Sequence, residues 1–310
     1  MTREEQSDMW KAEIEKGLKK VQTLREELRP VEFASGLWEQ LKGAYGDVRE
    51  DVAFLFCPRE MIPETKKIRR LDFEDKDSYE IIFDNLSENL THQLSLYGGT
   101  YLAMPYLALL LELKRLEGDF DWQMKIIALA GDLMATDIPY CGGGSENQET
   151  LPREVLDSYR LSVAKIQEMT KAFLDRNMDR LRQVEPQWMR QYFCTDALAI
   201  LGDPEAAYQM LMGQWEQCPL SCPDCGYYDE DMEADGFSNE EQLAKIEPAP
   251  SVIGQWDKES YEDTYVWFSN LVHLLEVEDA WKAAYYFGTY TCPVCGSKGT
   301  LIEWMKENQE

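Results

Sequence analysis

Residues 222–226 read Cys-Pro-Asp-Cys-Gly and residues 292–296 read Cys-Pro-Val-Cys-Gly, so the chain carries two copies of one five-residue pattern, here called a knuckle. Each knuckle presents two sulfurs from a tight turn, with a glycine after the second cysteine where the backbone must bend. Together they offer four thiolates, which is the ligand set of a closed tetrahedral zinc site. We therefore expect one structural zinc ion, held by Cys222, Cys225, Cys292 and Cys295.

The spacing between the knuckles leaves alternatives open. Residues 226 to 291, which is 66 residues, separate Cys225 from Cys292, so the intervening segment must return the chain to its start. The paired cysteines could instead form disulfides, stay as free thiols or act as a redox pair. A catalytic zinc is disfavoured, because four thiolates leave no open position for water. Cys218 is the spare ligand, and His273 could contact or replace a ligand.

The other cysteines are scattered singly. Cys57, Cys141 and Cys194 are expected to behave as small buried hydrophobic residues.

Charge is the second large feature of the sequence. The 310 residues carry a formal net charge of -27, and no Lys, Arg or His lies between Arg190 and Lys245. Such a surface repels phosphates, so nucleic-acid binding is disfavoured and a basic protein partner is favoured. The alternative is that the acidic residues serve only solubility. The segment contains Asp196, Asp203, Glu205, Glu216, Asp224, Asp229, Glu230, Asp231, Glu233, Asp235, Glu240 and Glu241.

The compartment is predicted from what the sequence lacks. The N-terminus, Met1 to Glu5, does not resemble a secretory signal, and the longest apolar run, Tyr101 to Leu111, is too short to span a bilayer. We expect a cytoplasmic protein without membrane contact. A reducing compartment favours metal over disulfides at the knuckles.

Apolar residues recur at spacings of three and four along most of the chain, which predicts amphipathic helices joined by short turns. After Cys225 we expect loop and short strands to about residue 258, then two helices, and a strand at Gly299–Trp304. The predicted domains are a helical part over residues 1–217 and a zinc-knuckle module over 218–310. The expected helices span residues 2–28, 35–45, 77–97, 100–117, 119–138, 152–182, 186–201, 204–215, 260–275 and 277–288.

Three stretches carry a family resemblance. HQLSLYGGTYLAMPYLALLLEL (92–113) and DALAILGDPEAAYQML (196–211) resemble the paired-helix units of bacterial HEAT-like α-solenoid proteins, with Ala103 and Pro105 at the positions of that family's Ala-x-Pro. YYFGTYTCPVCG (285–296) resembles members that end in a zinc-knuckle module. The resemblance implies an all-α fold, a HEAT-like α/α solenoid with a small zinc-ribbon-like C-terminal module. It also implies a protein-binding scaffold, and some relatives resemble antitoxins or immunity proteins.

Little in the sequence indicates catalysis. His92 and His273 are its two histidines, and neither belongs to a nucleophile or metalloprotease motif. We expect a non-enzymatic scaffold, with an enzyme whose site lies between solenoid and zinc module as the alternative. A nucleic-acid-binding zinc protein ranks last, with basic residues only in segments such as 66–70. Trp256 and Trp267 are candidate binding anchors.

Overall fold

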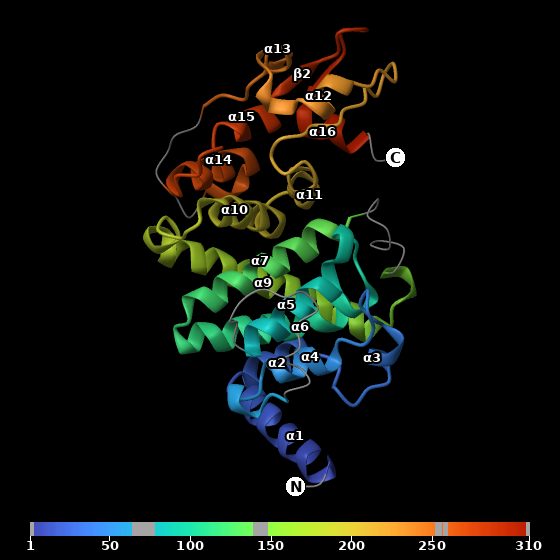
Figure 1. The fold of residues 1–310 in the computed structure, drawn as a ribbon, viewed down its shortest axis with the longest axis vertical. Helices are drawn as coiled ribbons and strands as arrows, with labels where there is room; N and C mark the ends of the chain where they lie inside the picture. The colour runs from blue at the N-terminus through green and yellow to red at the C-terminus, as the bar shows by residue number, and fades with distance from the viewer. Residues whose placement is uncertain (1–2, 64–77, 139–147, 252–255, 257–259, 308–310) are drawn as a thin grey trace. The chain divides into compact units, whose positions relative to one another are not determined.

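Helices make up most of the computed structural model (Figure 1). The structure describes residues 3–63, 78–138, 148–251, 256 and 260–307. Within these residues the fold is mostly α, with one small three-stranded sheet. None of the described helices is both long enough and apolar enough to cross a membrane.

The chain divides into two compact units, Met1–Met169 and Thr170–Glu310. The division falls within α9 (Arg153–Leu181), whereas the sequence led us to expect a boundary after residue 217. The earlier position has a physical reason: α10 (Gln187–Leu201) packs on α14 (Thr264–Leu274), and α11 (Pro204–Met212) packs on α16 (Leu301–Glu307). Whether residues 218–310 form a separate module stays a prediction.

The core of unit 1 is built on α6 (Gly98–Glu117) and α7 (Phe120–Thr136), which pack side by side (Figure 1). Every residue from Gly99 to Leu111 is buried, as expected for a helix surrounded by others. Gly118 ends α6 in the left-handed conformation, and the Asp119 side chain caps α7. Among the described residues, the remaining elements of unit 1 before α9 are α1 (Arg3–Lys19), α2 (Gln22–Leu28), α3 (Leu37–Gln40), α4 (Arg49–Phe54), the 3-10 turn η1 (Arg59–Met61), α5 (Ser78–Thr91) and the 3-10 turn η3 (His92–Leu94).

Gly98 and Gly99 begin α6, although we expected them to end the preceding helix. The Gly99 backbone N–H donates to the Lys42 carbonyl at 2.9 Å. A Cβ at Gly99 would lie 3.0 Å from the Gly43 nitrogen, so a glycine permits this close approach of two backbones. The first expected helix also differs, because it breaks at residues 20–21 into α1 and α2.

Unit 2 joins helices to a small antiparallel sheet in the order β1-β2-β3. In the sheet Ile246 of β1 lies opposite Tyr290 of β2, which lies opposite Gly299 of β3. The hairpin of β2 and β3 therefore carries the second knuckle at its tip, and β1 follows the first knuckle. The elements are α12 (Glu230–Ala234), η4 (Gly236–Ser238), α13 (Glu240–Leu243), β1 (Ile246–Glu247), η5 (Ser260–Glu262), α15 (Lys282–Tyr286), β2 (Thr289–Thr291) and β3 (Lys298–Thr300).

Two expectations about unit 2 were wrong. Residues 227–251 contain short helices as well as a strand, because the Asp229 and Asn239 side chains accept backbone N–H groups and so cap α12 and α13. The strand expected over Gly299–Trp304 ends at Thr300, where α16 begins. Thr300 and Glu303 exchange backbone-to-side-chain hydrogen bonds at 2.9 and 3.2 Å, which is a capping box.

We predict that Leu109→Ala destabilises unit 1 by about 2–5 kcal/mol, because truncating a buried leucine leaves a cavity in the core. Leu109 is 0% exposed, whereas Leu116 in the same helix is 55% exposed. Leu116→Ala is therefore the matched control and should change the free energy of unfolding by less than about 0.5 kcal/mol. Denaturant unfolding of both variants measures the difference, and equal losses would contradict this assignment of the core.

Candidate metal centre

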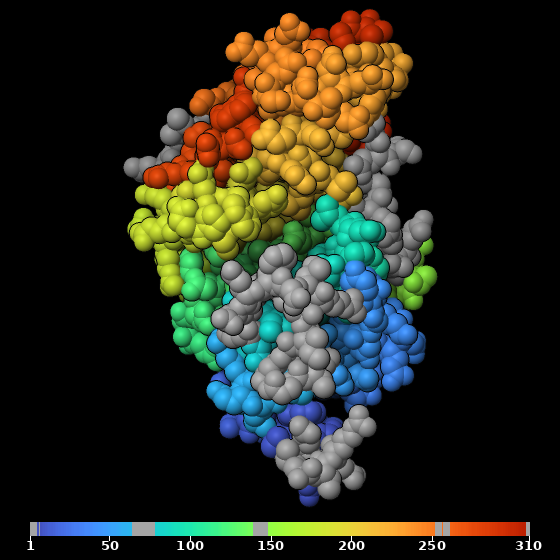
Figure 2. All heavy atoms as spheres, in the orientation of Figure 1, coloured from blue at the N-terminus to red at the C-terminus, as the bar shows by residue number. Residues whose placement is uncertain are grey.

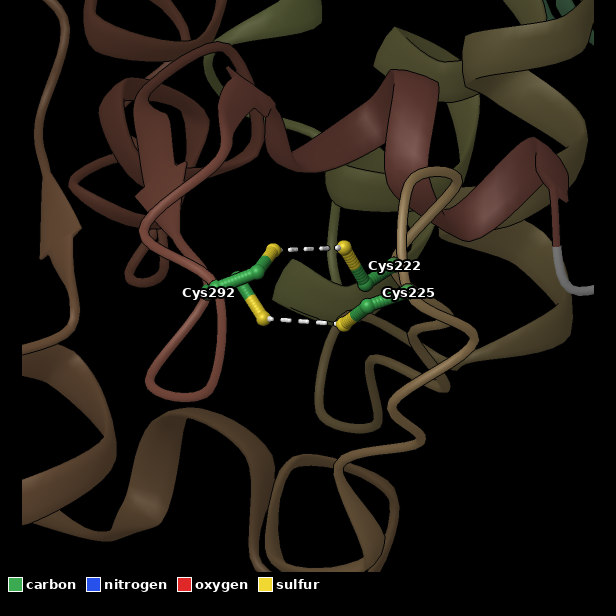
Figure 3. Close-up of side chains that lie close together, drawn as sticks. Cys222, Cys225 and Cys292 are labelled. Carbon is green, nitrogen blue, oxygen red and sulfur yellow. Dashed lines mark hydrogen bonds between the residues drawn. The ribbon is translucent and has the colours of Figure 1, made fainter.

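The structure brings the sulfurs of Cys222, Cys225, Cys292 and Cys295 within 4.8 Å of one another. The Cys222 and Cys295 sulfurs are 3.6 Å apart, and those of Cys225 and Cys292 are 3.7 Å apart. Figure 3 shows side chains from two loops pointing toward each other across this gap. Four sulfurs that are distant along the chain thus form one group that is able to hold a metal ion.

The two knuckles have the same backbone hydrogen bonds. In the first, Gly226 N–H donates to the Cys222 carbonyl at 2.8 Å, and in the second, Gly296 N–H donates to the Cys292 carbonyl at 3.0 Å. Each glycine has a positive φ, +70° and +77° respectively, and a Cβ at either position would meet open space. Glycine is therefore required for its backbone conformation and not to relieve steric crowding.

The spacing of the sulfurs fits a metal better than a disulfide. A disulfide needs an S–S bond of about 2.05 Å. Sulfurs that surround one ion tetrahedrally at about 2.3 Å lie about 3.8 Å apart. The Cys222–Cys295 and Cys225–Cys292 distances of 3.6 and 3.7 Å match the second arrangement, and all four cysteines are free thiols.

The four thiols differ in solvent exposure and in pKa. Cys222 and Cys292 are buried, whereas Cys225 and Cys295 are exposed. Burial raises the pKa of Cys292, but backbone N–H groups of Cys295 and Val294 outweigh it and leave the pKa lowered to about 7. The Tyr227 backbone N–H lowers the pKa of Cys225, but desolvation and the neighbouring sulfurs raise it to about 12. Without a cation, the group therefore retains protons among its sulfurs, and a metal ion would have to displace them.

Asp229 ties the two knuckles together. Its side chain is only 1% exposed and accepts hydrogen bonds from Lys245 Nζ at 2.7 Å and from the Tyr290 hydroxyl at 2.5 Å. Burial raises the pKa of the Asp229 carboxyl, but the bonds from Lys245, Tyr290 and the Met232 N–H together hold it below its ordinary value. Asp229 follows the first knuckle and Tyr290 precedes the second. Their hydrogen bond therefore holds together two segments that are far apart in the sequence.

A second contact joins the knuckles at their tips. The Ser297 hydroxyl, just after the second knuckle, donates to the Asp224 carboxylate inside the first. Two polar links therefore flank the sulfur group, one buried at Asp229 and one exposed at Asp224.

Other residues singled out from the sequence lie outside this group. Cys218 is buried, burial raises the pKa of its thiol, and its sulfur is not among the four. His273 Nδ1 lies 2.7 Å from the Ser269 carbonyl within α14. Cys57 and Cys194 are buried as expected, and Cys141 lies outside the described residues. Neither the expected spare cysteine nor His273 is part of the described sulfur group.

The two tryptophans expected to anchor a partner are not both accessible. Trp267 is 0% exposed and therefore unable to contact a partner, while Trp256 is half-buried and donates to Asp175 at 3.0 Å. Trp281 is instead 42% exposed, beside the rings of Phe237 and Tyr285.

The second histidine, His92, also lies outside the sulfur group. Its Nδ1 is 2.7 Å from the Tyr45 hydroxyl.

No protein-family model, no curated protein and no solved structure matches this chain. The resemblance to HEAT-like solenoids stays a prediction, and the functional argument rests on the geometry of the chain.

We predict that Tyr290→Phe lowers the stability of unit 2 by about 1–3 kcal/mol, because Asp229 loses one of the donors that compensate its burial. Tyr285→Phe is the control, since the described residues include no hydrogen-bond partner of the Tyr285 hydroxyl and the side chain is half-buried. Denaturant unfolding and the rate of proteolysis within residues 218–300 measure the effect. Equal stability of both variants would show that the Asp229 link does not hold the knuckles together.

Proposed function

We propose that the four cysteines hold a structural zinc ion. Four sulfur ligands within 4.8 Å of one another favour zinc over hard cations such as Mg²⁺ or Ca²⁺, which prefer oxygen. With all four positions taken by protein, the ion offers no open site for substrate, so its role is to stabilise the fold. A reducing compartment such as the cytoplasm suits this proposal, because the ligand sulfurs must stay reduced and not form disulfides.

We further propose that the protein is a non-enzymatic scaffold that presents an acidic surface to a basic protein partner. The observation that carries this proposal is a set of exposed carboxylates directly after the first knuckle, here called the acidic segment. Within the described residues, none of its members forms an ion pair. They are Glu230, Asp231, Glu233, Asp235, Glu240 and Glu241.

Neighbouring acidic residues are treated differently by the fold. Buried Asp229 is neutralised by Lys245, and Glu216 pairs with the buried Lys282 at 2.6 Å. Lysine side chains therefore neutralise Asp229 and Glu216, whereas no described ion pair neutralises the carboxylates of the acidic segment. Figure 2 shows orange atoms of the chain after the first knuckle covering much of the visible face of unit 2. Such a surface attracts cations and accelerates encounter with a basic protein.

The solenoid assignment supports the same function. The α6–α7 and α10–α11 pairs each pack together across turns of a few residues, which is the unit of an α/α repeat. The resemblance to bacterial HEAT-like proteins adds an immunity- or antitoxin-like role, in which the basic partner is a toxin that this chain neutralises.

We predict that purified protein binds about one zinc ion per chain and that Cys222→Ser and Cys292→Ser abolish this binding. Metal binding at such a site contributes folding free energy on the order of 10 kcal/mol, so residues 218–300 should become sensitive to protease in both variants while α5 to α7 stay protected. Elemental analysis and limited proteolysis measure the two effects.

Cys218→Ala is the control for the zinc measurement, because Cys218 is buried outside the sulfur group. It should retain the metal. Metal-free wild-type protein, purified under reducing conditions without chelator, would refute the zinc proposal.

We predict that affinity purification from a bacterial lysate retains basic proteins at about 0.05 M salt and releases them at about 0.5 M, because salt screens attraction between exposed charges. The variant Glu230→Gln, Glu233→Gln, Glu240→Gln should lose them. The control Glu27→Gln, Glu154→Gln, Glu278→Gln removes the same charge from exposed positions elsewhere and should retain them. Mass spectrometry identifies the retained proteins.

Retention of only neutral or acidic proteins would contradict the proposed partner. Equal retention by the two triple variants would show that net charge, rather than the acidic segment, governs binding.

A further inference from the structure

Two close pairs of sulfurs in the metal centre join one knuckle to the other. Cys222 approaches Cys295 at 3.6 Å. Cys225 approaches Cys292 at 3.7 Å (Figure 3). Each pair therefore joins a residue of the 222–226 knuckle to a residue of the 292–296 knuckle.

Each of these pairs combines one exposed and one buried cysteine. Cys295 and Cys225 are exposed, whereas their respective partners Cys222 and Cys292 are buried. An oxidant in solution meets the exposed sulfur first, and the buried sulfur of the facing knuckle is then in position to react with it. This is the arrangement of an attacked thiol beside a resolving thiol.

We propose that the metal centre is also an oxidation site, at which peroxide converts the four thiolates into two disulfides, Cys222–Cys295 and Cys225–Cys292, with release of the zinc. The proposal rests on the zinc site proposed above. In each pair the exposed thiolate attacks hydrogen peroxide, which breaks the O–O bond and yields a sulfenic acid and hydroxide. The buried thiolate then attacks that sulfur, forming the S–S bond and releasing a second hydroxide.

The pairing across the knuckles has a structural consequence. Disulfides within each knuckle would leave the two knuckles connected by noncovalent contacts alone, such as those of Asp229 and Asp224. Disulfides between the knuckles replace the ion as a covalent link, so the oxidised chain loses its metal and keeps the knuckles together. Oxidation therefore differs from chelation, which removes the metal without adding a link.

The sequence allows the two pairings to be distinguished. Trypsin cleaves after Arg190, Lys245, Lys282 and Lys298, so the first knuckle lies in peptide 191–245 and the second in peptide 283–298. Pairing between knuckles produces one cross-linked peptide pair, and pairing within knuckles produces two separate peptides. Further cleavage before Asp224 separates Cys222 from Cys225, and fragmentation then assigns each linkage.

The test treats purified wild-type protein with hydrogen peroxide, follows zinc release with a chromogenic chelator and maps the linkages by mass spectrometry under non-reducing conditions. We expect one zinc released per chain for two peroxide molecules consumed, with Cys222–Cys295 and Cys225–Cys292 as the dominant linkages. Dithiothreitol and zinc should restore the starting state. The oxidised protein should resist protease within residues 218–300 more than the chelated protein, by about ten-fold in cleavage rate.

Two variants sharpen the result. Cys225→Ser should form only Cys222–Cys295 and consume half the peroxide, whereas Cys218→Ala should behave as wild type. If Cys225→Ser does not fold, the wild-type linkage map still decides. Linkages within each knuckle, or oxidation to sulfinic acid without linkage, would overturn the inference while leaving the zinc proposal intact. Protein that contains no zinc before oxidation would instead overturn the zinc proposal.

Discussion

The structure of unit 2 depends on one buried carboxylate, that of Asp229. The two knuckles are far apart in sequence, and the entropy of closing so long a loop must be offset by contacts that hold its ends together. Asp229 supplies these contacts by accepting hydrogen bonds from Tyr290, next to the second knuckle, and from Lys245, next to β1. A carboxylate that is 1% exposed is tolerated only because a cation and two further donors compensate its charge.

The protein contacts already place the two knuckles side by side, so the proposed zinc would stabilise an arrangement that exists without it. The register of β1 and β2 places Ile246 opposite Tyr290, so the sheet and the Asp229 bonds fix the same segments. The Ser297–Asp224 bond does the same at the exposed tips. Because these contacts do not involve sulfur, the sulfurs' spacing follows from the surrounding fold, and the ion adds free energy to a site whose shape is set by its neighbours.

Features coded by adjacent residues could be predicted from the sequence, and features that depend on distant packing could not. The knuckles and the break between helices at Gly202 and Asp203 are local patterns, and each lies where it was expected. The capping box of Thr300 and Glu303 is also a local pattern, although a strand was expected there. In contrast, Trp267 is fully buried and Trp281 is 42% exposed, because the burial of each ring depends on which elements pack against α14 and α15.

Stabilisation of helix N-termini is a simpler explanation of the acidic segment than a role in binding a partner. Five of its six residues lie in the first turns of α12 and α13, where a carboxylate stabilises the positive end of a helix by about 0.3–1 kcal/mol. Helix stability, however, would equally favour cations in the last turns, and neither helix has one there. Helix capping therefore accounts for the carboxylates but not for a chain without any cation from residue 191 to 244. The missing cations leave the exposed carboxylates of this segment without a basic neighbour along the chain, which suits the proposed basic partner and is not needed by the two short helices.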